Sequence, residues 1–174
     1  MNTLIIREPK IEDQNIFIAA MRNSQALHNP WIKSPQTENA FKAYILRSQQ
    51  VNQKCFLLCD FLGNIVGVFN ISEIVLGQFQ SAYLGFYAVA NYAGKGYMSR
   101  GIKLILKNIF EEMKLHRIEA NIQPENSSSI NLVKANGFIK EGYSPRYLNV
   151  DGQWRDHERW ALTYENWNEI IFGR

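Results

Sequence analysis

The chain has 174 residues, which corresponds to about one domain at roughly 150 residues per domain. Hydrophobic residues make up 46% and charged residues 20% of the chain, a composition that is typical of a globular protein and excludes wholesale disorder. The 19 basic and 16 acidic residues leave a net charge of +3, which favours small anionic ligands but does not indicate nucleic-acid binding. We therefore expect a single domain over residues 1–174 with no direct contact to nucleic acid.

Two further patterns bear on the cellular compartment. The N-terminus has no basic stretch followed by an apolar segment of signal-peptide length, and the uncharged stretch 74–94 is interrupted by glycines and polar residues, so we expect no membrane span. Cys55 and Cys59, the two cysteines, lie four residues apart on a predicted strand, ~13 Å from each other and too far for a disulfide. Two thiols without a neighbouring histidine make a poor metal site. We expect reduced cysteines, no bound metal and a cytoplasmic protein.

The first half of the chain begins with a predicted strand over 4–7. Apolar residues that include Ile11, Ile16 and Ile18 then predict a helix over 11–21. A second helix is predicted over 38–49, with Phe41, Tyr44 and Ile45 on one face. The runs 55–61 and 65–71, rich in β-branched and aromatic residues, flank Gly63-Asn64 and predict a hairpin.

The second half alternates strands with helices. A strand over 81–89 precedes a helix over 98–113, whose apolar residues repeat at the spacing of one buried stripe. A short strand over 117–122 precedes a helix that ends near Asn136-Gly137, where glycine is a common terminator. The last strands, 138–146 (extended by 149–150) and 154–163, flank the hairpin signal Asp151-Gly152. The pattern predicts antiparallel hairpins combined with a β-α-β-α-β segment.

The residues from Ala88 to Ser99 connect a predicted strand directly to the longest predicted helix. Gly94 and Gly96 let the backbone turn and approach a ligand closely. The first turn of a helix offers unpaired N–H groups and a partial positive charge, which suit a phosphate or pyrophosphate, and Lys95 adds a formal charge. Two glycines also occur as plain turn punctuation, so the local pattern leaves both anion binding and a structural turn open.

Other catalytic signatures are missing. The loop lacks the Gly-x-x-x-x-Gly-Lys-Ser/Thr pattern of a P-loop and the third glycine of the dinucleotide-binding fingerprint. The three histidines are scattered, and no serine lies in a Gly-x-Ser-x-Gly elbow.

The loop resembles motif A of the GNAT acetyltransferases, in the Gln-Gly-Lys-Gly-Tyr-Met form of the branch that acetylates ribosomal-protein N-termini. Three further segments resemble the same family: Asn126 to Ser129, Asn136 to Tyr143, and Asp151 to His157, the last being similar to the hairpin of the RimJ-like ribosomal-protein alanine acetyltransferases. Ala93 departs from the pattern, because the family usually has Gln or Arg there. The resemblance implies an α/β fold (α+β, three-layer αβα) with a mixed, largely antiparallel sheet of about seven strands.

The resemblance also implies that acetyl-CoA binds where the neighbouring parallel strands 81–89 and 117–122 separate. A backbone N–H near Val89 would polarise the thioester carbonyl, an effect typically worth about 3 kcal/mol. Ser129 would donate a proton to the leaving thiol, although Asn126 and Ser129 are equally explained as an N-cap and a polar helix position. The implied cofactor-binding residues are Val89, Gly94, Lys95, Gly96, Tyr97, Met98, Ser99 and Asn126.

Transfer in this family is direct, from acetyl-CoA to a neutral amine within a ternary complex. An α-amine with a pKa of ~8 is about 10% neutral at pH 7, whereas a lysine side chain with a pKa of ~10.4 is neutral at well under 0.1%, so an N-terminal acceptor needs less help from a base. Glu73 is the candidate base, although a solvated carboxylate at a strand end needs no such role. The candidate acceptor-binding residues are Trp31, Tyr147, Trp154 and Asp156, of which both tryptophans could instead cap the core.

The leading expectation is acetylation of a protein N-terminal amine, with a ribosomal protein as the candidate partner. Acetylation of a small amine (a polyamine, an amino acid or an antibiotic) is the first alternative. A catalytically silent CoA-binding or ribosome-associated module is the second, and Ala93 keeps it open. We expect a monomer or homodimer without a membrane partner.

Overall fold

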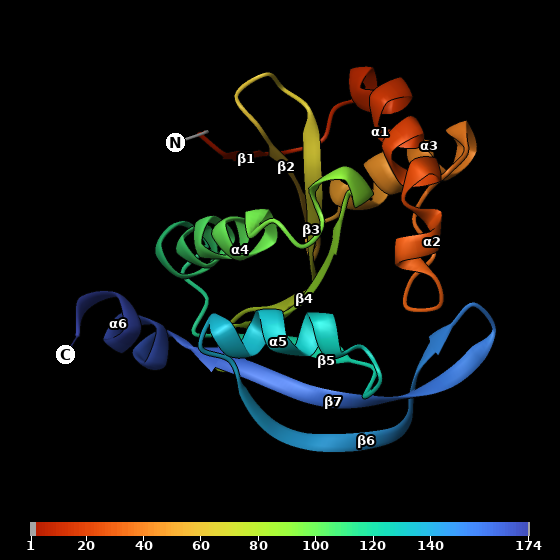
Figure 1. Ribbon diagram of the computed structural model, residues 1–174. Helices are drawn as coiled ribbons and strands as arrows, with labels where there is room; N and C mark the ends of the chain where they lie inside the picture. Colours follow the sequence, from red (N-terminus) through yellow and green to blue (C-terminus); the bar gives the residue numbers. More distant parts are fainter. Residues whose placement is uncertain (1–2, 174) are drawn as a thin grey trace.

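The computed structural model describes residues 3–173, which fold around one mixed sheet (Figure 1). Over this part of the chain the sheet has seven strands in the order β1-β2-β3-β4-β5-β7-β6. Neighbouring strands are antiparallel except β4 and β5, which are parallel. The strands are β1 (Ile5–Arg7), β2 (Lys54–Cys59), β3 (Ile65–Val75), β4 (Ser81–Ala88), β5 (Arg117–Ile122), β6 (Ile139–Val150) and β7 (Gln153–Thr163). The expected fold class is confirmed.

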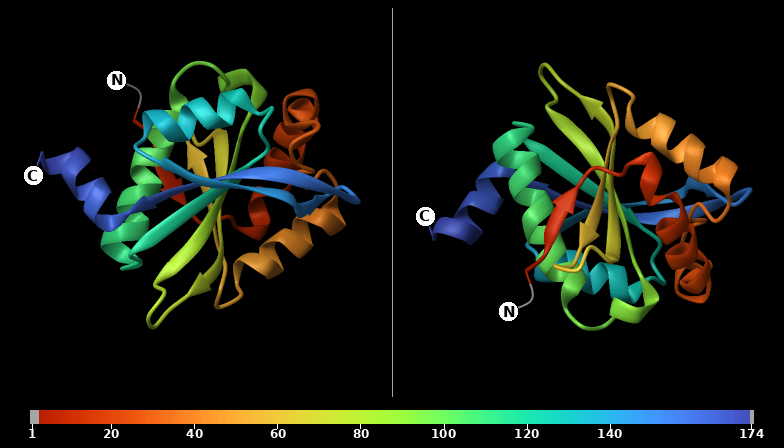
Figure 2. Two further views of the ribbon diagram at one scale, coloured as in Figure 1. Left: turned by 90° about the horizontal axis from the view of Figure 1, so that it is seen from below. Right: turned by 90° about the horizontal axis from the view of Figure 1, so that it is seen from above.

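Helices cover both faces of this sheet and make three layers (Figure 2). They are α1 (Gln14–Asn23), α2 (Gln25–His28), α3 (Glu38–Ser48), α4 (Tyr97–Lys107), α5 (Ser127–Ala135) and α6 (Tyr164–Phe172). One buried cluster lies between the sheet and α4, α5 and α6, with Phe69, Ile102 and Val133 among its members. A second lies between the sheet and α1 and α3, and includes Phe17 and Phe41.

Helix α4 packs directly on the sheet because one of its residues is a glycine. A Cβ atom added to Gly101 would lie 2.5 Å from Leu58 Cδ2 and 2.9 Å from Phe69 Cε2. Ile102 and Ile105, on the predicted apolar stripe, are fully buried beside it. This close approach sets the position of the first turn of α4, which begins at the loop identified in the sequence.

Three helices differ from the sequence prediction. Ile11 and Ile16 are exposed, whereas Ile18 is buried as predicted, together with Phe17 and Met21, so the buried face of this segment was predicted only in part. The helix predicted over 98–113 is α-helical only to Lys107 and continues as a π-helical turn over 108–112. Helix α6 was not predicted, because a segment of nine residues that packs through one main anchor has little periodicity.

Strand β2 is shorter than the sequence predicts, and the two cysteines on it are buried. The strand predicted to reach Phe61 stops at Cys59, since the carboxylate of Asp60 accepts from the Leu62 and Asn64 amides and forms the turn. Trp160 and Trp167 are buried in the core. Cys55 and Cys59 are free and buried on β2, which confirms the prediction of unpaired thiols.

Candidate active site

Strands β4 and β5 separate soon after they begin to pair. Their register runs from Ser81 opposite Arg117 to Tyr83 opposite Glu119 and no further, whereas β4 continues to Ala88. The remaining part of β4 therefore has backbone groups on one side without a partner in β5. Successive residues of a strand direct their backbone N–H and C=O groups alternately to its two sides. Groups of this kind that lack a neighbouring strand can bind an extended ligand.

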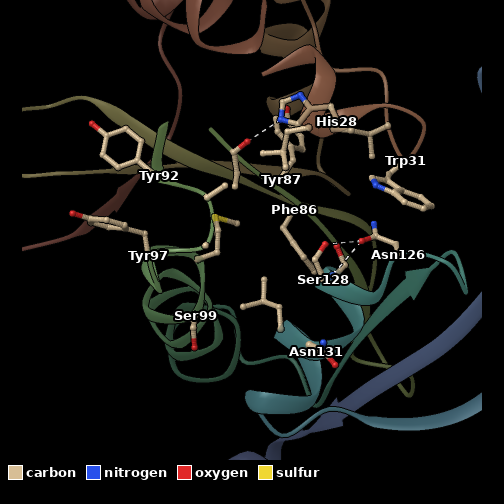
Figure 3. Close-up of a pocket in the computed structure, with 18 of the residues that line it drawn as sticks. His28, Trp31, Phe86, Tyr87, Tyr92, Tyr97, Ser99, Asn126, Ser128 and Asn131 are labelled. Atoms are coloured by element: carbon tan, nitrogen blue, oxygen red, sulfur yellow. Dashed lines mark hydrogen bonds between the residues drawn. The ribbon is translucent and has the colours of Figure 1, made fainter. Parts of the chain in front are cut away.

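A cavity of about 500 Å³ lies at this separation (Figure 3). It is lined by the end of β4, by the loop before α4, by the start of α5 and by the segment that follows α2. Of the residues implied by the resemblance, Gly94, Gly96, Tyr97, Met98, Ser99, Asn126, Ser129 and Trp31 line it. Segments far apart in the sequence thus meet at one site, as the sequence predicted for the loop and for α5.

The loop before α4 has the conformation that its glycines permit. Gly94 and Gly96 have φ angles of 70° and 75°, which residues with a Cβ rarely adopt, and Gly96 is the N-cap of α4. Within residues 3–173, no atom apart from those of the adjacent residues lies within 4 Å of a Cβ placed on either glycine, so the backbone here is open to a ligand. The amide groups of the first turn of α4 face this open space and suit an anion.

Lys95 and Ala93 modify the expected contacts. The Lys95 ammonium donates to the Asn91 carbonyl oxygen at 2.8 Å, and Lys95 does not line the cavity. Ala93 does line it and brings no polar side-chain group. The anion site therefore depends chiefly on backbone amides, and the direct phosphate contact implied for Lys95 stays a prediction.

The start of α5 has the N-cap that its sequence predicted. Asn126 Oδ1 accepts from the Ser129 amide at 3.2 Å and from the Ser128 hydroxyl at 3.1 Å. Its Nδ2 group is left to donate, and the side chain lines the cavity (Figure 3). The capping role of Asn126 and a ligand-binding role are thus compatible, because they use different atoms.

Val89 does not have the role implied for it. Its amide donates to the Val66 carbonyl oxygen at 2.9 Å, and its side chain is buried between the sheet and α1 and α3. Alternation along β4 then turns the backbone groups of Phe86 and Ala88 toward the separation from β5. The backbone of Phe86 and the amide of Ala88 replace Val89 as candidates for pairing with a ligand, whereas the Ala88 carbonyl oxygen is already bound by His28.

His28 is a further residue of this site that was not among the predicted ones. Its Nε2 lies 2.8 Å from the Ala88 carbonyl oxygen and its Nδ1 lies 3.0 Å from the Ser34 hydroxyl, and the ring lines the cavity (Figure 3). Because a carbonyl only accepts, Nε2 carries the proton and the Ser34 hydroxyl donates to Nδ1. Burial lowers the pKa of His28 and keeps the ring neutral. No motif in the sequence pointed to this residue.

The segment after α2 spans the separation between the strands. His28 anchors it to the end of β4, and the Trp31 carbonyl oxygen accepts from Gln123 Nε2 at 3.3 Å, just beyond β5. An exposed ion pair of 3.0 Å joins Lys33 to Asp151 in the β6–β7 turn. Trp31 is therefore held beside the cavity, and its role in acceptor binding stays a prediction.

The other predicted acceptor residues lie outside this cavity. Trp154 is 62% exposed on β7. Asp156 accepts from the Tyr143 hydroxyl and from the Arg146 amide, and these bonds hold an irregular turn of β6. Glu73 is exposed at the irregularity where β3 pairs with the start of β4, at the far end from Ala88. The roles of Trp154, Asp156 and Glu73 stay predictions that the cavity does not support.

Tyr147 lies on the sheet face opposite α4 and α5, next to Tyr83. Hydrogen bonding to Tyr147, together with burial, raises the pKa of Tyr83 to about 12. The Tyr147 ring also lies 6.3 Å from the ring of His157, whose pKa burial lowers. Tyr83 and Tyr147 therefore lie beside the separation of β4 and β5, on the sheet face that α4 and α5 do not cover.

Comparison with known proteins agrees with this geometry. A family model for the acetyltransferase (GNAT) domain matches residues 3–139. The chain belongs to the GNAT acetyltransferase family. Within residues 3–173 this GNAT chain has no helix long and apolar enough to cross a membrane, and no cluster of three metal-ligating side chains.

Named relatives of this GNAT chain include enzymes that modify ribosomal proteins. The ribosomal protein uS5-alanine N-acetyltransferase of Escherichia coli is 42% identical over 103 residues, which cover 59% of this chain and 53% of that enzyme. The chain thus spans about half the length of the curated relative it matches. Mycobacterium smegmatis RimJ, solved with CoA-disulfide, is 26% identical with a TM-score of 0.86 and covers 98% of this chain and 90% of its own.

A third comparison shows how widely the fold is shared. Vibrio cholerae spermidine N-acetyltransferase, solved with CoA and spermine, has a TM-score of 0.81 over 94% of this chain and 97% of its own. At 20% identity this likeness concerns the fold alone.

Proposed function

We propose that this chain transfers an acetyl group from acetyl-CoA to a primary amine. The observation that carries the proposal is the separation of β4 and β5 beside a 500 Å³ cavity that ends at the glycine-bearing start of α4. An extended thioester with a pyrophosphate fits this arrangement, since one end of the cavity offers helix amides and the other offers strand amides.

Residues of the chain would bind the parts of acetyl-CoA in order along the cavity. The amides from Gly94 to Ser99 would hold the pyrophosphate, and the backbone of Phe86 and the amide of Ala88 would pair with the pantetheine arm. Asn126 would donate a hydrogen bond from Nδ2 to the pantetheine arm, because its Oδ1 already caps α5. Acetyl-CoA supplies an activated acyl carbon, and a strand amide aimed at its carbonyl oxygen would stabilise the oxyanion that develops there. Ser129 lines the cavity and stays the candidate proton donor to the departing thiol.

A protein N-terminus is the acceptor that we propose. The named E. coli relative acts on the alanine of ribosomal protein uS5, and the chain is 42% identical to it over 103 residues. A polyamine would call for a surplus of carboxylates, but the carboxylates of β5, β6 and β7 named next, on both faces of the sheet, already have partners. Glu119 and Glu141 bind Arg117, Glu158 binds Lys140, and Asp156 binds Tyr143.

Mass spectrometry of purified protein incubated with acetyl-CoA tests the proposal. Short peptides that begin with Ala or Ser are compared with the same peptides carrying a blocked N-terminus and with spermidine. We expect acetylation of the free N-terminal peptides. Acetylation of spermidine alone would support the small-amine alternative, and CoA binding without any acetylated amine would support the silent module. The expected cytoplasmic location and the monomeric or dimeric state stay part of this proposal.

A further inference from the structure

Because the proposed acetyl-CoA site lies against the starts of α4 and α5, an acceptor amine would reach the thioester from the opposite face of the sheet. Ala82, Leu84, Ile118 and Ala120 fill the core beneath those helices. Since side chains alternate along a strand, Tyr83 on β4 and Glu119 on β5 project to the opposite face. They are also the last residues that pair before the strands separate. Tyr83 and Glu119 therefore stand side by side where the separation begins.

The phosphate end of the cavity lies at the other end of β4, beside Ala88 and the start of α4. A ligand that extends from there along β4 carries its reactive end toward Tyr83 and Glu119. Gly85 follows Tyr83 on the same face and is exposed, and a Cβ placed on it would meet only Asn70 atoms, at 3.9–4.0 Å. The backbone of β4 is thus open to an acceptor directly next to this pair.

Glu119 is held in place by one ion pair and has one oxygen to spare. Its Oε1 accepts from Arg117 Nε at 2.9 Å, and its side chain is 20% exposed. Among the described residues no side chain or amide donates to Oε2. The other nitrogens of Arg117 bind both oxygens of Glu141, whose charge Arg159 also offsets, so Oε2 of Glu119 is the oxygen of this pair of carboxylates that stays without a donor among the described residues.

The other polar groups that face this site leave Glu119 as the proton acceptor nearest the separation. From β4 comes Tyr83, which stays protonated at neutral pH because its pKa is about 12. From β5 come Arg117 and Asn121, and Asn121 Oδ1 has no partner among the described residues. Strand β6 contributes Glu141 and Tyr147, and strand β7 contributes His157 and Arg159. His157 lies beyond the last residue of β7 that pairs with β5, farther along the strands than Glu119.

We propose that Glu119 receives the ammonium group of the acceptor and takes its first proton, directly or through one water molecule. The neutral amine then attacks the thioester carbon, the N–C bond forms as the C–S bond breaks, and the second amine proton ends on the departing thiol. The proton on Glu119 passes to solvent. This inference rests on the acetyltransferase function proposed above, and it assigns to Glu119 the role that the sequence suggested for Glu73.

Steady-state kinetics of Glu119→Gln with an N-terminal peptide tests the inference. Glutamine keeps the size of the side chain and an oxygen for Arg117, so the ion pair becomes a hydrogen bond. We expect kcat to fall about 100-fold or more, the loss typical of a removed general base, with the KM for acetyl-CoA unchanged within about two-fold. The residual rate should rise with pH up to the pKa of the peptide amine, whereas the wild-type rate reaches its plateau at lower pH. Glu119→Asp, which keeps a carboxylate, should recover part of the rate.

Two further variants separate catalysis from folding. Glu141→Gln breaks the second ion pair of Arg117 without changing the group at the separation, and Glu112→Gln is a matched change at an exposed position. Both should retain wild-type kcat. The inference is overturned if Glu119→Gln keeps the wild-type rate and pH profile, if Glu73→Gln loses the activity instead, or if Glu141→Gln loses as much as Glu119→Gln. A wild-type protein that acetylates no amine would overturn the proposed function itself.

Discussion

His28 binds the last residue of β4 through its Nε2 atom, which lies 2.8 Å from the carbonyl oxygen of Ala88. The two residues are 60 positions apart in the sequence. This bond, together with that of Gln123 to the Trp31 carbonyl, holds the segment after α2 across the separated ends of β4 and β5. The wall of the proposed acetyl-CoA site therefore depends on one buried imidazole.

Replacement of this imidazole should weaken both folding and cofactor binding. His28→Phe keeps an aromatic ring but leaves the Ala88 carbonyl and the Ser34 hydroxyl without their partner. We expect a loss of about 1–3 kcal/mol in the free energy of unfolding, since a buried polar group without a partner costs that much. The KM for acetyl-CoA should rise while kcat at saturation changes less. His116→Phe, at an exposed ring, is the control and should change stability by about 0.5 kcal/mol or less.

Stability should fall on mild acidification. Burial lowers the pKa of both His28 and His157, so below pH 6.5 the unfolded chain binds protons that the folded chain does not. The free energy of unfolding therefore reaches its maximum above about pH 7. As the pH falls below this value, it decreases by at most about 1.4 kcal/mol per pH unit for each histidine. Urea unfolding at pH 7.5, 6.0 and 5.0 measures this slope. His28→Phe should remove part of it, and a slope identical in the two proteins would contradict the assignment.

A carboxylate at the start of α4 should oppose the pyrophosphate. Gly96→Asp places a negative charge where the helix amides face the cavity, so we expect a large increase in the KM for acetyl-CoA. Gly77→Asp is a matched control, because Gly77 has a similar positive φ of 72° and open space around it but lies in the β3–β4 turn. Both variants should lose stability from the left-handed backbone. If both raise the KM equally, backbone strain rather than charge explains the effect.

The two cysteines should be unreactive in the folded protein. Cys55 and Cys59 are 2% and 0% exposed, and burial raises the pKa of each thiol. We expect slow reaction with a thiol reagent at pH 8 and reaction of two thiols per chain after unfolding in guanidinium. Rapid labelling of the folded protein would show that β2 opens locally.

Much of the fold follows from local patterns in the sequence. The Gly-Asn and Asp-Gly turns and the apolar stripe of α4 predicted their elements because they act over a few residues. The π-helical turn over 108–112 and α6 did not follow, since the position of Trp167 in the core is set by residues far away, such as Phe110 at 5.2 Å between ring centroids. Likewise, the exposure of Ile16 depends on where α1 lies against the sheet.

The sequence by itself determined the glycine-bearing loop, its helix and the N-cap at Asn126, because backbone conformation and capping are local properties. Only the tertiary structure decided which backbone groups are free: the Val89 amide is paired with β3 and the Ala88 carbonyl oxygen with His28, whereas the Phe86 backbone and the Ala88 amide face the separation. It also decided that Glu119, and not Glu73, stands where β4 and β5 part. Strand register and the point at which two strands diverge depend on the packing of the whole sheet, which no short segment encodes.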